Sequence, residues 1–173
     1  AMRQLLLQRY HDDPPPLPAL RALRPLADGQ RWVFSGREDE QGASELNGTV
    51  TGLGDVPQDS AVRRELNAAL GLDALFAPIL KHNPQISWVY YTSASDFMYL
   101  APKPPLDDFH YERAFLLKPF WQEALAEHNP QRRQIISSLY EDAGGKDLMI
   151  TLSAPVYEQN RMLGVVSLDL GIE

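Results

Sequence analysis

Apolar residues recur at helical spacing in two parts of the first half of the chain. In each part the periodic stretch is closed by a proline: the three consecutive prolines after Asp13 end the first, and Pro84 ends the second. Asp59 or Ser60 stands where a helix N-cap is needed. We therefore predict helices over residues 2–10, 18–26, 63–70 and 72–81.

The period then changes from about 3.6 residues to 2. Over residues 86–91 the alternate side chains on both faces are apolar or aromatic, which predicts a central strand that is covered on both sides. Residues 96–100 are its expected hairpin partner, and residues 115–127 read as a helix.

The last third alternates as strands over residues 134–140, 148–157 and 162–170. The paired glycines within residues 142–145 predict a turn, and residues 158–161 form a compact hairpin loop. Parallel neighbours need a crossover of about a dozen residues, so these strands must be antiparallel.

The stretch 31–54 leaves two interpretations open. Residues 31–35 and 46–53 read as short strands, with a polar loop over residues 35–44 between them. These pieces are either extra strands of the sheet or a membrane-distal elaboration.

Composition excludes several classes of function. The 173 residues carry a net charge of −7, which disfavours nucleic acid as a partner because phosphate contacts need a positive field. There is no cysteine, which excludes disulfides and cysteine–zinc sites. No apolar run approaches the about 18 residues that span a bilayer.

Recognisable catalytic and metal motifs are missing from the sequence. The nucleophile-elbow pattern, the phosphate-binding loop and the dinucleotide glycine fingerprint do not occur. The four histidines lack the spacing of metal ligands. We expect neither a metal site nor a cofactor, and we expect that the chain is not an enzyme by itself.

Several segments together resemble one family of bacterial sensors. The pairing of a Ser-Ala-Pro-Val-Tyr strand with a Gly-Val-Val-x-Leu-Asp strand is their most specific feature. The segments are residues 88–93, 120–124, 139–142, 151–157 and 163–169. They are similar to the Cache or PDC sensor domains, which are PAS-like extracytoplasmic domains of transmembrane receptors. The resemblance covers residues 60–173 and leaves residues 1–59 as an N-terminal helix and lead-in that packs on or extends the sensor.

The resemblance implies an α+β fold. Its sheet is antiparallel, has five to six strands and packs against a long N-terminal helix and flanking helices. It also implies a periplasmic domain of an inner-membrane receptor, anchored through flanking segments, and it allows a homodimer. The output is a diguanylate cyclase, histidine kinase, phosphatase or chemoreceptor. The expected ligand is a small metabolite: an amino acid, an amine or a small carboxylate.

Members that bind amino acids share a set of pocket residues, and five positions of this chain fall at members of that set. Tyr140 and Asp169 match it, whereas Lys118 and Phe120 depart from it and leave the ligand class open. Asp169 falls at the aspartate that takes a ligand ammonium, and Tyr140 at a downstream tyrosine. Trp121 falls at the pocket tyrosine, Phe120 at a tryptophan and Lys118 at an arginine. A lysine can form an ion pair with a carboxylate, but it cannot make the bidentate hydrogen bonds of an arginine guanidinium.

Physical arguments single out the same acid. Asp169 lies between two leucines in an apolar strand, where a carboxylate is costly unless it is paired. It is either a pocket carboxylate or a strand-end residue that reaches solvent. Trp88, Tyr90 and Tyr91 are candidates for an aromatic pocket wall, although strand aromatics are more often plain core. Tyr90 and Tyr91 point to opposite faces, so only one of them can line the pocket.

Weaker candidates follow the first central strand. Ser93 and Asp96 stand at its end, where such residues usually satisfy a turn.

Two functions from different classes therefore compete. The first is a ligand sensor, and the alternative is a ligand-free dimerisation or interaction module of a membrane signalling protein. An enclosed polar and aromatic cavity around Trp121, Tyr140 and Asp169 favours the sensor, and an interior filled with side chains favours the alternative.

Overall fold

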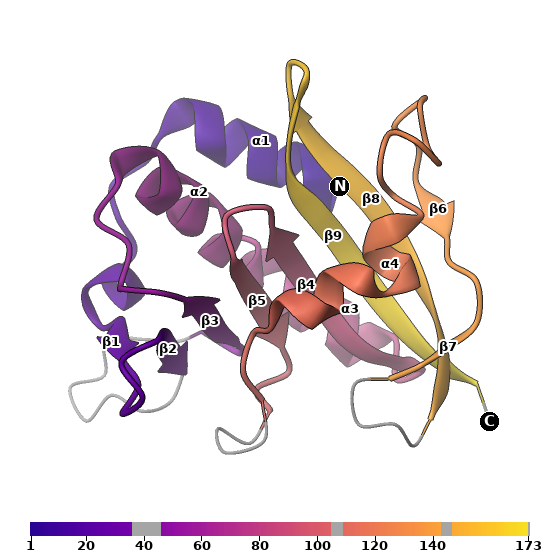
Figure 1. Cartoon of the computed structure of the whole chain (residues 1–173), viewed down its shortest axis with the longest axis horizontal. Helices are drawn as coiled ribbons and strands as arrows, with labels where there is room; N and C mark the ends of the chain where they lie inside the picture. Colours follow the sequence, from indigo (N-terminus) through magenta and orange to yellow (C-terminus); the bar gives the residue numbers. More distant parts are fainter. Residues whose placement is uncertain (36–45, 105–108, 143–146, 173) are drawn as a thin grey trace.

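The computed structural model describes residues 1–35, 46–104, 109–142 and 147–172, and these form an α+β fold built on one antiparallel sheet (Figure 1). The strand order is β1-β2-β3-β5-β4-β9-β8-β6, and β7 also pairs with β8. The strands are β1 (Arg24–Pro25), β2 (Arg31–Ser35), β3 (Thr49–Leu53), β4 (Ile86–Ser93), β5 (Phe97–Ala101), β6 (Ile135–Ile136), β7 (Tyr140–Glu141), β8 (Leu148–Glu158) and β9 (Arg161–Ile172). Six of them have five or more residues, and β1, β6 and β7 have two each. The predicted fold class is confirmed.

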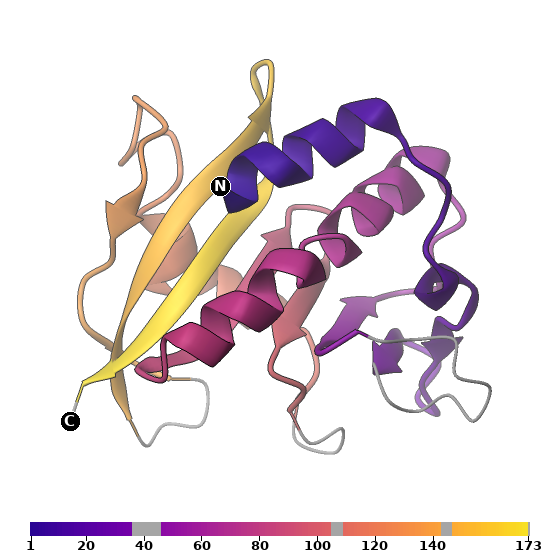
Figure 2. The same cartoon turned by 180° about the vertical axis from the view of Figure 1, so that it is seen from behind.

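The two faces of the sheet are covered differently. Helices α1 (Met2–Asp12), α2 (Ser60–Leu70) and α3 (Asp73–His82) lie on one face (Figure 2). The short helices η2 (Arg113–Leu117) and α4 (Pro119–Gln122) lie on the other (Figure 1). Asp59 caps α2 as predicted, because its Oδ1 accepts the backbone N–H groups of Ala61 and Val62 at 2.9 and 3.1 Å.

Each face has its own hydrophobic cluster. The cluster under the three helices includes Leu66, Phe76 and Tyr91. The cluster under η2 and α4 includes Tyr90 and Trp121. Strand β4 contributes to both clusters and pairs on its two sides with β5 and β9, so the prediction of a central strand covered on both faces is confirmed.

Two predicted elements are broken into smaller pieces. The helix expected over residues 115–127 is wrong, because Lys118 has the extended backbone (φ −77°, ψ 155°) that a following proline favours, and Pro119 starts a new helix. The strand expected over residues 134–140 is also wrong as one element. Only β6 and β7 pair with β8 there.

The N-terminal part packs on the sheet and joins it. Arg3 Nη1 of α1 donates to the carbonyl oxygen of Arg132 at 2.9 Å. The helix expected over residues 18–26 is a single 3-10 turn, η1 (Pro18–Arg21), followed by β1. Strands β2 and β3 fall within the predicted strands, and they extend the same sheet that contains β4.

Two predictions fall largely outside the described residues. They are the loop over residues 35–44 and the turn over residues 142–145. Among the helices of the described part, none combines the length and hydropathy that crossing a bilayer requires.

Candidate ligand-binding site

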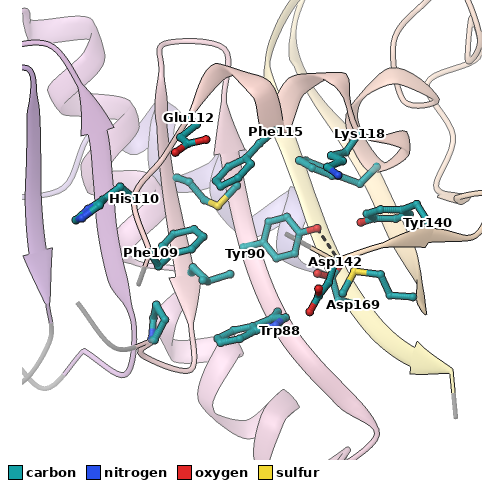
Figure 3. A pocket seen from close by; sticks show the side chains of 15 residues that line it. Trp88, Tyr90, Phe109, His110, Glu112, Phe115, Lys118, Tyr140, Asp142 and Asp169 are labelled. Atoms are coloured by element: carbon teal, nitrogen blue, oxygen red, sulfur yellow. Dashed lines mark hydrogen bonds between the residues drawn. The ribbon is translucent and has the colours of Figure 1, made fainter. Parts of the chain in front are cut away.

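A cavity of about 430 Å³ lies between the sheet and the η2–α4 segment (Figure 3). Its volume is within the range typical of small-molecule sites. Its floor comes from neighbouring strands, and its cover comes from the chain that leads into η2 and α4. The lining residues are Trp88, Tyr90, Met98, Leu100, Pro104, Phe109, His110, Glu112, Phe115, Lys118, Phe120, Tyr140, Asp142, Met149 and Asp169.

Asp169 is the buried acid of this cavity, with 6% of its surface exposed. It pairs with Trp88 of β4 on one side and with Thr151 of β8 on the other. Tyr90 and Thr151 donate their hydroxyl protons to Asp169 Oδ1 at 2.8 and 2.7 Å. No hydrogen bond from the described residues reaches Oδ2, which is therefore left for a guest in the cavity.

Tyr140 extends this network by one further hydroxyl. Its oxygen lies 2.5 Å from Thr151 Oγ1. Thr151 gives its only hydroxyl proton to Asp169, so Tyr140 is the donor and Thr151 the acceptor. The result is a chain of donors that runs from the cavity wall to the carboxylate.

Burial sets the protonation states in this network. It raises the pKa of Asp169 to about 6, although the bonds from Thr151 and Tyr90 pull the value back. Burial also raises the pKa of Tyr90 far above its usual value and that of Tyr140 to about 12. At neutral pH both tyrosines are therefore neutral donors, and Asp169 is mostly ionised.

Lys118 supplies a positive charge on the cover of the cavity. It is partly buried, and its side chain makes no hydrogen bond or ion pair with the described residues. Its position follows from the extended backbone that Pro119 imposes at the break between η2 and α4. The cavity thus has a buried acid on its floor and an unpaired cation on its cover, a combination that suits a zwitterion.

Six of the eight predicted site residues line the cavity. They are Trp88, Tyr90, Lys118, Phe120, Tyr140 and Asp169.

Tyr91 and Trp121 do not line the cavity. Tyr91 faces the helices and donates to Glu65 Oε1 at 2.6 Å. Trp121 is buried in the core cluster beside Phe120. The weaker candidates also lie elsewhere: Ser93 bonds Glu65, and Asp96 pairs with Arg113.

The sequence of this region matches a known sensor family. The model of the methyl-accepting chemotaxis protein-like first PDC sensor domain matches residues 61–173, which is more than half of the chain. The protein belongs to this family. The predicted Cache/PDC resemblance is confirmed, and the chain carries a PDC sensor domain, a ligand-sensing domain of an extracytoplasmic kind.

Solved structures similar to this PDC sensor domain are distant. The ligand-binding domain of the amino acid chemoreceptor PctB of Pseudomonas aeruginosa PAO1, in complex with L-Gln, is 19% identical with a TM-score of 0.43 over 56% of this chain and 37% of that chain. That of PctC from the same bacterium, in complex with GABA, is 22% identical with a TM-score of 0.37, covering 69% and 46%. That of the Campylobacter jejuni chemoreceptor Tlp3, in complex with L-norvaline, is 25% identical with a TM-score of 0.40, covering 54% and 37%.

This chain thus spans less than half the length of each of these three domains. No curated protein matches it significantly.

Sequence reasoning missed several residues of the PDC sensor's cavity. Among them are the lining acids Glu112 and Asp142. Thr151 was also missed: it does not line the cavity but bonds Asp169 from behind it. Thr151 had a usable signal, because it lies on the strand paired with the strand of Asp169. Glu112 lies in a segment whose approach to the sheet depends on tertiary structure, and its sequence context carries no such signal.

Proposed function

We propose that this PDC sensor domain binds a small ligand with an ammonium group, an amino acid or another amine, in the cavity beside Asp169. The observation that carries the proposal is the state of that carboxylate: it is 6% exposed, and both hydroxyl donors lie on Oδ1. An ionised carboxylate in such surroundings is costly unless a cation pairs with it. An ammonium at Oδ2 supplies that cation.

The other cavity groups suit the rest of such a ligand. Lys118 can take the carboxylate of an amino acid as a point charge. Tyr90 and Phe120 meet edge to face with their ring centroids 5.4 Å apart, and with Trp88 they offer aromatic surface to an ammonium or a short apolar side chain. A simple carboxylate without an amine gains the lysine but faces Asp169, so it is the weaker candidate among the three expected ligand classes.

Titration calorimetry and thermal shift with a panel of amino acids, amines and carboxylates test this proposal. A ligand that binds stabilises the folded domain by an amount set by its concentration over Kd. We expect at least one amino acid or amine to bind, and we expect Asp169→Asn to abolish the signal. Asp55→Asn is the matched control, because Asp55 is exposed and does not line the cavity.

Two results would count against the proposal. One is that no member of the panel binds the wild-type domain, which favours the ligand-free interaction module. The other is binding that Asp169→Asn leaves unchanged.

We also propose the setting of the domain: the periplasmic side of an inner-membrane receptor, anchored by flanking segments and working as a homodimer. The family match to a chemotaxis-receptor-like sensor supports this setting. Alkaline phosphatase fusions to the full-length receptor test the location, and light scattering of the domain tests the dimer. We propose that the domain itself has no catalytic activity, which assays with generic ester and phosphate substrates can refute.

A further inference from the structure

The groups proposed to hold an ammonium and a carboxylate occupy one side of the cavity. Figure 3 shows Asp169 and Lys118 on that side and Phe109 on the opposite side, with Tyr90 between them. Phe109 stacks on Phe115, with the ring centroids 5.7 Å apart and the ring planes 17° from parallel. Both of these rings line the cavity. A ligand held at the charged side therefore faces an aromatic wall on the other.

The apolar side of the floor lies two strands away from the buried acid. Asp169 of β9 is opposite Trp88 of β4. The next lining residue of β4, Tyr90, is opposite Leu100 of β5. Neighbouring strands are about 4.8 Å apart, so β5 lies about 10 Å from β9 across the sheet. Leu100 and Met98 of β5 are buried and line the cavity. A ligand anchored at Asp169 must extend across β4 to contact them.

The carboxylate on this side of the cavity is exposed. Figure 3 shows Glu112 near Phe115, and Glu112 is open to solvent. The pairing of an exposed carboxylate with a cation contributes little to affinity. The buried Met98 and Leu100, by contrast, favour an apolar group that leaves water to contact them. The far side of the cavity therefore favours an apolar group over a charged one.

Resting on the proposed function, we propose that the ligand is an amino acid or amine with a bulky apolar side chain, such as an aromatic ring. Its ammonium binds Asp169 Oδ2, and its side chain crosses β4 to a subsite formed by Met98, Leu100, Phe109 and Phe115. A methyl side chain ends about 1.5 Å beyond the α-carbon, so it cannot contact this subsite. An aromatic ring fills it and gains from contact with the phenylalanine rings and the methionine sulfur.

Two matched ligand pairs test this proposal by calorimetry on the domain. L-Phenylalanine differs from L-alanine by one phenyl group, and 2-phenylethylamine differs from ethylamine in the same way. In each pair for which binding is detected, we expect the Kd of the aromatic member to be lower by about tenfold or more, because the ring leaves water. The comparison uses the wild-type domain, so it stands even where a variant folds poorly.

L-Lysine tests the apolar character of the subsite. Its side chain is long but ends in a charge, which loses hydration against the apolar wall without a buried partner there. We expect its Kd to be higher than that of L-phenylalanine by about tenfold or more.

Phe115→Ala assigns the preference to the subsite. Phe115 lies in η2 and is partly buried. We expect the loss of its ring to reduce the preference for the phenyl group by about threefold or more, and to change the Kd of L-alanine by less than about twofold. Leu117→Ala is the matched control, because Leu117 lies in the same short helix, is 76% exposed and does not line the cavity. It should keep the full preference. Circular dichroism and thermal melts confirm that both variants are folded.

The outcomes separate this inference from the function on which it rests. Alanine or ethylamine binding as tightly as its aromatic partner overturns the inference and leaves the amine-binding function intact. Lysine binding as tightly as phenylalanine does the same. A preference that Phe115→Ala leaves unchanged overturns the assignment of the subsite. If no amine binds the domain at all, both proposals fall.

Discussion

Thr151 lies directly opposite Asp169 in the β8–β9 ladder because the register shifts by one residue between Val156 and Tyr157. Next to the hairpin turn, Glu158 pairs with Arg161. Continued without the shift, that register would place Ile150 opposite Asp169. The irregularity therefore sets a hydroxyl rather than an isoleucine beside the buried carboxylate.

Thr151→Val tests this relationship while keeping the shape of the side chain. It removes one donor from Asp169 and leaves the Tyr140 hydroxyl without its acceptor. We expect unfolding to become easier by about 1–3 kcal/mol in urea titrations. Amine affinity should fall about threefold to tenfold, because a carboxylate with one donor fewer is harder to ionise.

Ser153→Ala is the control for this variant. Ser153 lies on the same strand and is buried, but its hydroxyl meets Ser167 at 3.2 Å outside the cavity. It should leave affinity unchanged. Equal ligand affinity in Thr151→Val and wild type contradicts the assigned role of Thr151.

Asp169→Asn should stabilise the ligand-free domain at pH 7. The pKa of about 6 in the folded domain lies above the ordinary aspartate value of 3.8. The contribution of Asp169 to stability is therefore fully present below pH 4 and is lost as the pH rises through 6. This loss is about 3 kcal/mol at most. The neutral amide avoids it and still offers an oxygen to Tyr90 and Thr151. In urea titrations the free energy of unfolding of this variant should exceed that of the wild type by about 1–3 kcal/mol at pH 7 and differ little at pH 4. A variant that is less stable than the wild type at pH 7 contradicts the expected cost of burying the carboxylate.

Amine binding should weaken in acid. An ammonium pairs with the ionised form of Asp169, whose pKa is about 6 in the free domain. The Kd should therefore stay level above pH 7 and rise by up to about tenfold per unit below pH 6. Calorimetry near pH 6 should also detect proton release on binding, seen as a dependence of the heat on the buffer. A flat profile between pH 5 and 7 would show that the carboxylate does not hold the cation.

Glu65→Ala should destabilise the fold without changing the site. Glu65 is 3% exposed, and its Oε1 accepts the hydroxyls of Tyr91 and Ser93 at 2.6 Å each. Removing the carboxylate leaves two buried hydroxyl donors without an acceptor. The free energy of unfolding in urea should fall by about 2–4 kcal/mol. Glu65→Gln retains an acceptor and should recover most of this loss. Ligand affinity should change by less than about twofold in both variants, since the residue lies across the sheet from the cavity.

The local pattern of apolar and polar residues predicted much of the fold and part of the candidate site. Alternation identified β4, β8 and β9, and the two leucines around Asp169 marked it as a buried acid. The helix expected over residues 115–127 was wrong because helical periodicity was read through Pro119, which breaks that segment.

Other features depend on tertiary structure. Asp142 and Glu112 line the same cavity from separate segments of the chain, and no local period in the sequence predicts that they share it. The division of the chain at residue 59 stays a prediction. Strands β2 and β3 precede that position and share the sheet of the sensor.

Tyr90 and Tyr91 are consecutive in β4, yet one hydroxyl holds Asp169 on the cavity face and the other holds Glu65 of α2 on the helical face. A single peptide unit joins these two anchor points. A shift of β4 that accommodates a ligand in the cavity would therefore also displace the Tyr91 hydroxyl that bonds Glu65 of α2. Two adjacent residues of β4 thus tie the cavity face and the helical face of the sheet to each other.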